Sequence, residues 1–96
     1  MSKVTVVARL TVRADAVETV RPELLGLIAP TRSEEGCLEY RLHQDLDDPT
    51  VFVFYENWES MACLQRHLGS DHYRRYAAAV GDLITAKSVL KMNEIG

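Results

Sequence analysis

The stretch HQDLDDPTVFVFYENWES, residues 43–60, contains the feature that decides the fold. An aspartate precedes Pro49 in an acidic segment, and this pair favours a tight turn because the carboxylate can accept a hydrogen bond from the nearby backbone. After the turn, residues 50–58 are rich in β-branched and aromatic side chains, which favour a strand. Residues 37–45, before the turn, alternate apolar and polar side chains. The sequence therefore predicts an antiparallel β-hairpin.

The pairing register of this hairpin determines which side chains share a face of the sheet. If Asp45 pairs with Thr50, then Tyr40 lies opposite Tyr55. We expect these side chains to face the helices: Leu38, Tyr40, Leu42, Val53, Tyr55 and Asn57. The opposite face would carry Val7, Cys37, His43, Phe52, Phe54 and Trp58, together with Arg9, Glu39, Arg41 and Glu56. A slip of one residue would invert this partner set.

Hydrophobic periodicity predicts a strand and a helix before the hairpin. Residues 3–12 alternate with the period of a strand, and Val4, Val6, Ala8, Leu10 and Val12 form the face to bury. Helical spacing then runs to Ile28, beginning with Asp15 and Glu18 in a pattern that resembles a capping box. Pro22 should kink this helix, and Pro30 should disturb or end its last turns, because proline lacks the backbone donor.

Two short helices and a final strand are predicted after the hairpin. Ser60 and Ser70 are candidate N-caps, and Gly69 ends the first of the two helices. Residues 86–95 favour a strand. The resulting order, β-α-β-β-α-(α)-β, predicts a single α+β domain over residues 1–96 with the ferredoxin-like arrangement, an antiparallel sheet with helices on one face. The open face mixes aromatic and charged side chains, so we expect a homodimer that packs sheet against sheet.

Composition and charge exclude several classes of function. The formal net charge is -3, which gives no electrostatic footprint for nucleic acid or an anionic membrane. No apolar run is long enough to span a bilayer, and none resembles a signal peptide. Cys37 and Cys63 do not form a CxxC pair and are interpreted as buried, reduced thiols. We therefore expect a cytoplasmic protein.

Three segments together resemble the antibiotic biosynthesis monooxygenase family of dimeric α+β barrels: VVARLTV, TRSEEGCLEYRLHQDLDDPTVFVFYENWES and HLGSDHYRRY. The resemblance implies a pocket in each protomer and a cofactor-independent oxygenation, in which a quinol or polyphenolic substrate supplies the electrons. The family also includes haem-degrading enzymes with a characteristic Asn, Trp and His. This sequence has Ala8, His67 and Ala77 at those places, so we expect no haem cofactor.

A phenolic substrate needs aromatic walls and a base that is poised near neutral pH. We predict His67 as the base, with Tyr55 and Asn57 as further catalytic residues. The predicted substrate-binding residues are Tyr40, His72, Tyr73, Tyr76 and Trp58. No metal-binding motif is present, and the acidic residues near Pro49 are better explained by the turn itself.

Each candidate also has a structural interpretation. The pair Tyr40 and Tyr55 would pack as cross-strand aromatics in any protein, and Trp58 would anchor the sheet or the interface. Asn57 would terminate its strand, and His67 and His72 would lie at helix ends. Two alternative functions therefore stay open: a non-enzymatic ligand-binding or stress-response dimer whose interior is filled by side chains, and an isomerase of a small phosphorylated or carbonyl metabolite.

Overall fold

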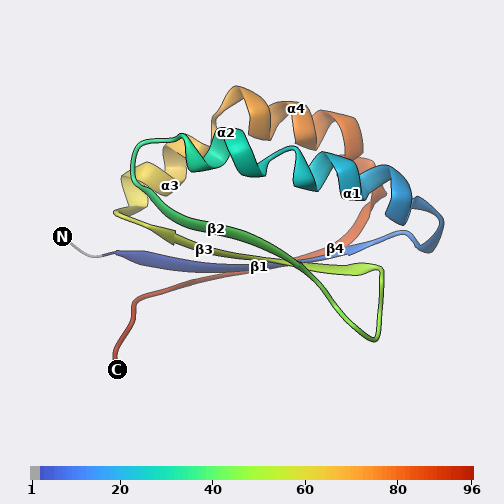
Figure 1. Ribbon diagram of the computed structural model, residues 1–96, viewed down its shortest axis with the longest axis horizontal. Helices are drawn as coiled ribbons and strands as arrows, with labels where there is room; N and C mark the ends of the chain where they lie inside the picture. Colours follow the sequence, from blue (N-terminus) through green and yellow to red (C-terminus); the bar gives the residue numbers. More distant parts are fainter. Residues whose placement is uncertain (1–2) are drawn as a thin grey trace.

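The computed structural model describes residues 3–96, which form an antiparallel sheet covered on one face by helices (Figure 1). The strands are β1 (Val4–Val12), β2 (Cys37–Gln44), β3 (Val51–Trp58) and β4 (Ile84–Met92). The helices are α1 (Val17–Leu25), α2 (Ile28–Arg32), α3 (Met61–Leu68) and α4 (Asp71–Val80), with 3₁₀ turns at Ala14–Ala16 and Gly81–Leu83. The strand order β2-β3-β1-β4 confirms the ferredoxin-like α+β fold.

The hydrophobic core lies between the sheet and the helices. The alternation of β1 is confirmed, because Val6, Leu10 and Val12 are each only 2% exposed. Val20 and Leu24 of α1 pack onto this face and are fully buried. The apolar face of β1 and the apolar stripe of α1 therefore pack against each other in one layer.

The register predicted for the hairpin is wrong by one residue. Tyr40 pairs with Glu56, and the neighbour across from Tyr55 is Arg41. The side chains that β3 presents to the helices are consequently Phe52, Phe54, Glu56 and Trp58, while Val53, Tyr55 and Asn57 face the opposite side. The pairing also shifts between Cys37 and Glu39 at the start of β2, a local bulge.

The turn at Pro49 explains this difference in register. The carboxylate of Asp48 accepts hydrogen bonds from the backbone N–H of Thr50 at 3.0 Å and from its hydroxyl at 2.6 Å. Thr50 is thereby held inside the turn. Asp45 instead bonds to Val51, with its N–H 3.0 Å from the carbonyl oxygen. The predicted role of the aspartate is confirmed, but the loop is one residue longer than expected.

The helical segment after β1 begins and breaks differently from the prediction. Asp15 makes an ion pair with Arg13 at 2.8 Å and does not cap the helix. Pro22 lies inside α1, which ends at Leu25. Pro30 is the third residue of the separate helix α2, where a missing backbone donor costs little because first-turn N–H groups have no partner within the helix. The single long helix is therefore two short ones.

The predicted caps of the later helices are confirmed. Ser60 accepts a hydrogen bond from the backbone N–H of Cys63, and Ser70 accepts one from that of Tyr73. Gly36, which leads into β2, has a φ of 84°, the left-handed region that favours glycine. These turns fix where α3 and α4 begin above the sheet.

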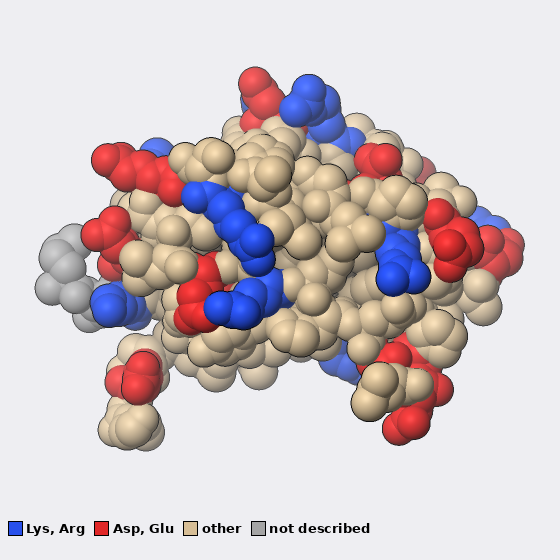
Figure 2. Space-filling view, in the orientation of Figure 1, with Lys and Arg blue, Asp and Glu red and all other residues tan. Residues whose placement is uncertain are grey.

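The face of the sheet opposite the helices is open to solvent in the single chain. Apolar side chains lie across it from Tyr55 through Val7 to Leu90, and Tyr55 and Leu90 are 38% and 55% exposed. Elsewhere charges of both signs are interspersed over the side of the molecule that Figure 2 shows. Within residues 3–96, no helix is long and apolar enough to cross a membrane.

Candidate functional site

A cavity of about 330 Å³ lies between the helices and the sheet. Its apolar walls come mainly from Val6, Ala8, Leu10, Leu27, Phe54 and Leu64. Its polar groups belong to Tyr40, Glu56, His67, Tyr73, Tyr76, Lys87 and Lys91. This size and this mixture of apolar wall and few polar groups are typical of a small-molecule site.

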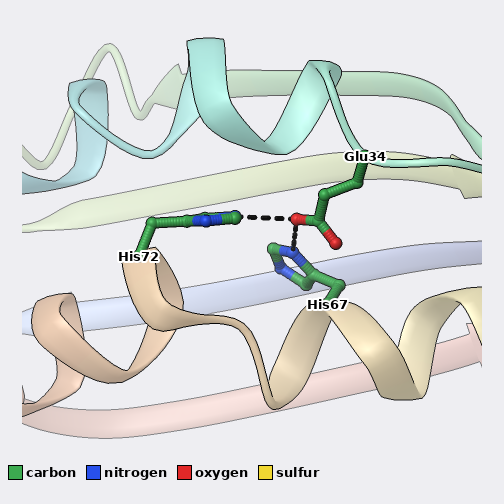
Figure 3. A group of neighbouring side chains, drawn as sticks. All are labelled: Glu34, His67 and His72. Carbon is green, nitrogen blue, oxygen red and sulfur yellow. Dashed lines mark hydrogen bonds and ion pairs between the residues drawn. The ribbon is translucent and has the colours of Figure 1, made fainter.

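His67 is almost completely buried in the cavity wall, at 1% exposure, as is Tyr40. The Ser60 cap starts α3 so that its last turn brings His67 under the loop between α2 and β2, where Glu34 lies (Figure 3). The ring nitrogen Nδ1 is 2.8 Å from the Glu34 carboxylate oxygen Oε2. Because a carboxylate accepts, Nδ1 carries the proton, and Nε2 is left as an acceptor. Among the described residues, no protein group bonds to Nε2.

Burial lowers the pKa of His67 below its ordinary value, and the hydrogen bond to Glu34 offsets part of this effect. The imidazole is therefore neutral near pH 7. The carboxylate fixes its tautomer and stabilises the imidazolium once a proton arrives. This arrangement of Glu34 and His67 is that of a general base with an orienting carboxylate.

His72 contacts the same carboxylate from the first turn of α4. Its Nε2 is 2.7 Å from Oε2 of Glu34, so one oxygen binds both histidine rings (Figure 3). The same nitrogen lies 3.2 Å from the hydroxyl of Ser70. The His72 side chain is 16% exposed, against 2% for that of His67. The cluster therefore runs from the buried site towards solvent.

Aromatic rings surround His67 on its other sides. The ring centroids of Trp58, Tyr73 and Tyr40 lie 4.9, 5.1 and 5.4 Å from that of His67. Burial, followed by the charge of Glu56, raises the pKa of Tyr40 far above its ordinary value. Burial also raises the pKa of Tyr76. Both phenols therefore stay protonated and can donate hydrogen bonds to a ligand in the cavity.

Glu56 is a second buried acid that faces the cavity, at 5% exposure. Its Oε1 accepts a hydrogen bond from the indole Nε1 of Trp58 at 2.9 Å. Burial raises the pKa of Glu56, and the bond to Trp58 lowers it in part. The carboxyl group is therefore easier to protonate than an exposed glutamate, which suits a group that exchanges a proton with a ligand.

Two basic residues of β4 line the cavity. Lys87 and Lys91 alternate with Val89 along the edge strand. The ammonium group of Lys87 donates to the hydroxyl of Tyr73 at 2.9 Å. Because these β4 residues are exposed, they mark the side on which the cavity is open.

The structure brings four of the predicted site residues together at the cavity, namely Tyr40, His67, Tyr73 and Tyr76. His72 lies outside the lining and is connected to His67 by the shared carboxylate of Glu34. Trp58 is fully buried behind His67 and supports it rather than lining the space.

Tyr55 and Asn57 lie on the opposite face of the sheet, so the predicted placement of both is wrong. There Asn57 accepts a hydrogen bond from Thr5 at 2.6 Å and donates one to Glu39 at 2.7 Å. Because the observed register differs by one residue from the predicted one, both side chains face away from the helices.

The two acidic residues of the site, Glu34 and Glu56, were not predicted. Glu56 was assigned to the wrong face with the rest of β3, although the apolar pattern of Phe52, Phe54 and Trp58 was a signal for the correct one. Glu34 lies in a loop that has no periodicity, far in sequence from its histidine partners. Glu34, His67 and His72 also place potential metal-ligand atoms within 4.8 Å of one another.

Comparison with known proteins agrees with this architecture. The Mycobacterium tuberculosis protein Rv0793 is 42% identical over 84 residues, which cover 88% of this chain and 82% of that protein. The Bacillus subtilis protein YcnE is 27% identical over 79 residues, which cover 82% of this chain and 83% of YcnE.

Solved structures match over almost the whole length. PA3566 from Pseudomonas aeruginosa has a TM-score of 0.94 at 31% identity and covers 100% of this chain and 97% of its own. The structure of Rv0793 has a TM-score of 0.91, and the match covers 99% of this chain and 97% of the Rv0793 chain. The family model described as antibiotic biosynthesis monooxygenase matches residues 3–79. The chain therefore belongs to the antibiotic biosynthesis monooxygenase family.

Proposed function

We propose that this protein is a cofactor-independent monooxygenase that oxidises a quinol or another polyphenolic aromatic compound in the cavity. The observation that carries the proposal is the buried, neutral His67, whose Nδ1 is held by Glu34 and whose Nε2 has no protein partner among the described residues. Membership of the family supports a monooxygenase activity. The aromatic rings around His67 supply a surface on which a planar substrate can pack.

The chemistry requires little from the protein beyond a base and a dry pocket. Nε2 of His67 takes the proton of a substrate hydroxyl, and Glu34 stabilises the imidazolium that forms. The electron-rich phenolate then reduces O₂ and bonds to it as a hydroperoxide, whose O–O bond breaks. One oxygen atom stays on the carbon as a carbonyl, and the other leaves as water with the single hydrogen of this carbon and the proton that His67 took from the hydroxyl.

Oxygen uptake tests the proposal. With a panel of hydroquinones and naphthoquinols in chelator-treated buffer, we expect one O₂ consumed per carbonyl product. An enzyme that consumes oxygen only after iron or flavin is added would contradict the proposal. Autoxidation is measured with heat-denatured protein and subtracted.

The lysines at the open side of the cavity support a second candidate, an isomerase of a small anionic carbonyl metabolite. Lys87 and Lys91 could bind a phosphate or carboxylate, while Glu56 or His67 moves a proton between carbons. Exchange of substrate C–H for deuterium in D₂O without oxygen uptake would favour this activity. The non-enzymatic alternative, in contrast, expected an interior filled by side chains and does not agree with the cavity.

We also propose that two chains pack through the open face of the sheet. Val7, Tyr55, Leu90 and Met92 form an apolar area there, with Arg9, Glu39 and Arg41 around it. A buried apolar centre with a polar rim is typical of a stable interface. Because the cavity lies on the other side of the sheet, each protomer would keep its own site.

A further inference from the structure

We infer that Glu34, His67 and His72 form a binding site for a divalent transition-metal ion of the zinc type. The three side chains come from three separate segments, namely the loop before β2, the last turn of α3 and the first turn of α4 (Figure 3). Their potential ligand atoms all lie within 4.8 Å of one another. Two imidazoles and one carboxylate are a ligand set that zinc, cobalt and nickel ions prefer over calcium or magnesium.

Side-chain rotation is needed to bring the present distances to those around an ion. Oε2 of Glu34 is 2.8 Å from Nδ1 of His67 and 2.7 Å from Nε2 of His72. Around a tetrahedral ion with bonds of about 2.1 Å, neighbouring ligand atoms lie roughly 3.4 Å apart. Rotation of the flexible glutamate side chain would widen both of these distances, and the two ring nitrogens, which lie within 4.8 Å of each other, would move to the same spacing. A water molecule would complete the coordination.

Both histidines can become ligands without a change in net charge on either ring. Each now donates a proton to Glu34 from the nitrogen that would bind the ion. Transfer of that proton to the other ring nitrogen frees the required lone pair. His72 is partly exposed, so an ion can enter from solvent on that side without crossing the cavity.

Metal binding would change what His67 offers to the cavity. With Nδ1 on the ion, Nε2 carries the proton and becomes a donor instead of an acceptor. If the proposed function holds, the ion therefore inhibits the base rather than serving as a catalyst. The binding site itself does not depend on that function.

Titration with Co²⁺ and Zn²⁺, in the absence of any substrate, tests the inference. We expect one ion per chain, visible absorption from bound Co²⁺ that Zn²⁺ abolishes, and a rise of several degrees in the melting temperature at saturating Zn²⁺. His72→Ala is the first variant, because this partly exposed residue can be removed with the least effect on folding. Loss of a hydrogen-bond partner of a ligand costs about 10–100-fold in affinity, so loss of a ligand should cost at least that much.

His43→Ala is the matched control. It also removes one of the three histidines, but His43 is exposed on the opposite face, and within residues 3–96 its ring bonds only to the carbonyl of Val53. The control should bind Co²⁺ like the unaltered protein. Three results would overturn the inference: no binding at micromolar ion, equal binding by His72→Ala, or loss of binding in His43→Ala. All three are read without an activity assay, so they are distinct from a failure of the proposed function.

Discussion

Glu56 shows how a single buried side chain can serve a site at the expense of stability. It lies against the cavity, where burial disfavours its charge, and only Trp58 donates a hydrogen bond to it among the described residues. A hydrophobic residue would pack there with less desolvation. The site therefore retains a carboxyl group that the fold does not require.

Glu56→Gln should raise the stability at neutral pH. The amide oxygen can still accept the bond from Trp58, while the cost of a buried charge is removed. The pKa of Glu56 is raised above 4.5 in the folded state, so above pH 4.5 the folded state holds this proton more tightly than the unfolded state does. The free energy of unfolding therefore falls as the pH rises and Glu56 loses its proton. The gain in melting temperature should therefore be present at pH 7 and shrink towards pH 4.5. A gain that is the same at both values would contradict this account.

Gly36 is a position where only glycine fits. An alanine there would bring its Cβ to 2.3 Å from Sγ of Cys63, and the φ of 84° is strained for any L side chain. Gly36→Ala should therefore lower the free energy of unfolding in urea by about 2 kcal/mol or more. Gly81→Ala is the control, since it has helical φ and no atom within 4 Å of the added Cβ. Equal effects of the two substitutions would show that the close approach at Gly36 is wrong.

At the scale of the elements, β3 determines which residues belong to the core. Phe54 stacks on Tyr40 with ring centroids 4.8 Å apart and is 4% exposed. Phe54→Ala should cost about 3–5 kcal/mol in unfolding free energy, because it leaves a cavity next to the site. In the register that the sequence suggested, Phe54 would lie in the interface instead. The substitution would then lower the unfolding free energy only slightly, by an amount that depends on protein concentration. Denaturation at two protein concentrations therefore distinguishes the two registers.

Element type and order could be predicted from sequence because each depends on local signals. The alternation in β1, the serine caps and the Asp-Pro turn all act within a few residues. The loop length was not predicted: one more residue in the loop reverses both faces of β3, and the hydrogen bonds that hold Thr50 in the turn fix that length. The same limit applies to the site. His67 and its tyrosines follow from helical spacing, whereas Glu34 joins them only through the tertiary fold.

The open sheet face is the surface through which we propose that two chains assemble. Sedimentation at micromolar concentration should give twice the 10.8 kDa of a single chain. Tyr55→Asp should produce a folded monomer, because it places a charge in the centre of the apolar area and leaves the core intact. Its far-UV circular dichroism should be unchanged. A single-chain mass for the unaltered protein would refute the sheet-to-sheet dimer.

The cavity lies on the helix side of the sheet and the apolar area on the other side, so the proposed site and the proposed interface are separate. Conservative changes on the two faces should therefore affect different measurements. Tyr55→Phe keeps the ring on the open face, while His67→Gln keeps the volume of the base and its bond to Glu34 but removes the basic nitrogen.

The most direct test of the account is the rate of oxygen uptake by His67→Gln with a hydroquinone substrate in chelator-treated buffer. If His67 is the base, the rate should fall by about 10²–10⁴-fold, while Tyr55→Phe should stay within about twofold of the unaltered protein. Circular dichroism confirms that both variants are folded. A His67→Gln variant that consumes oxygen at the unaltered rate would contradict the assignment of the base.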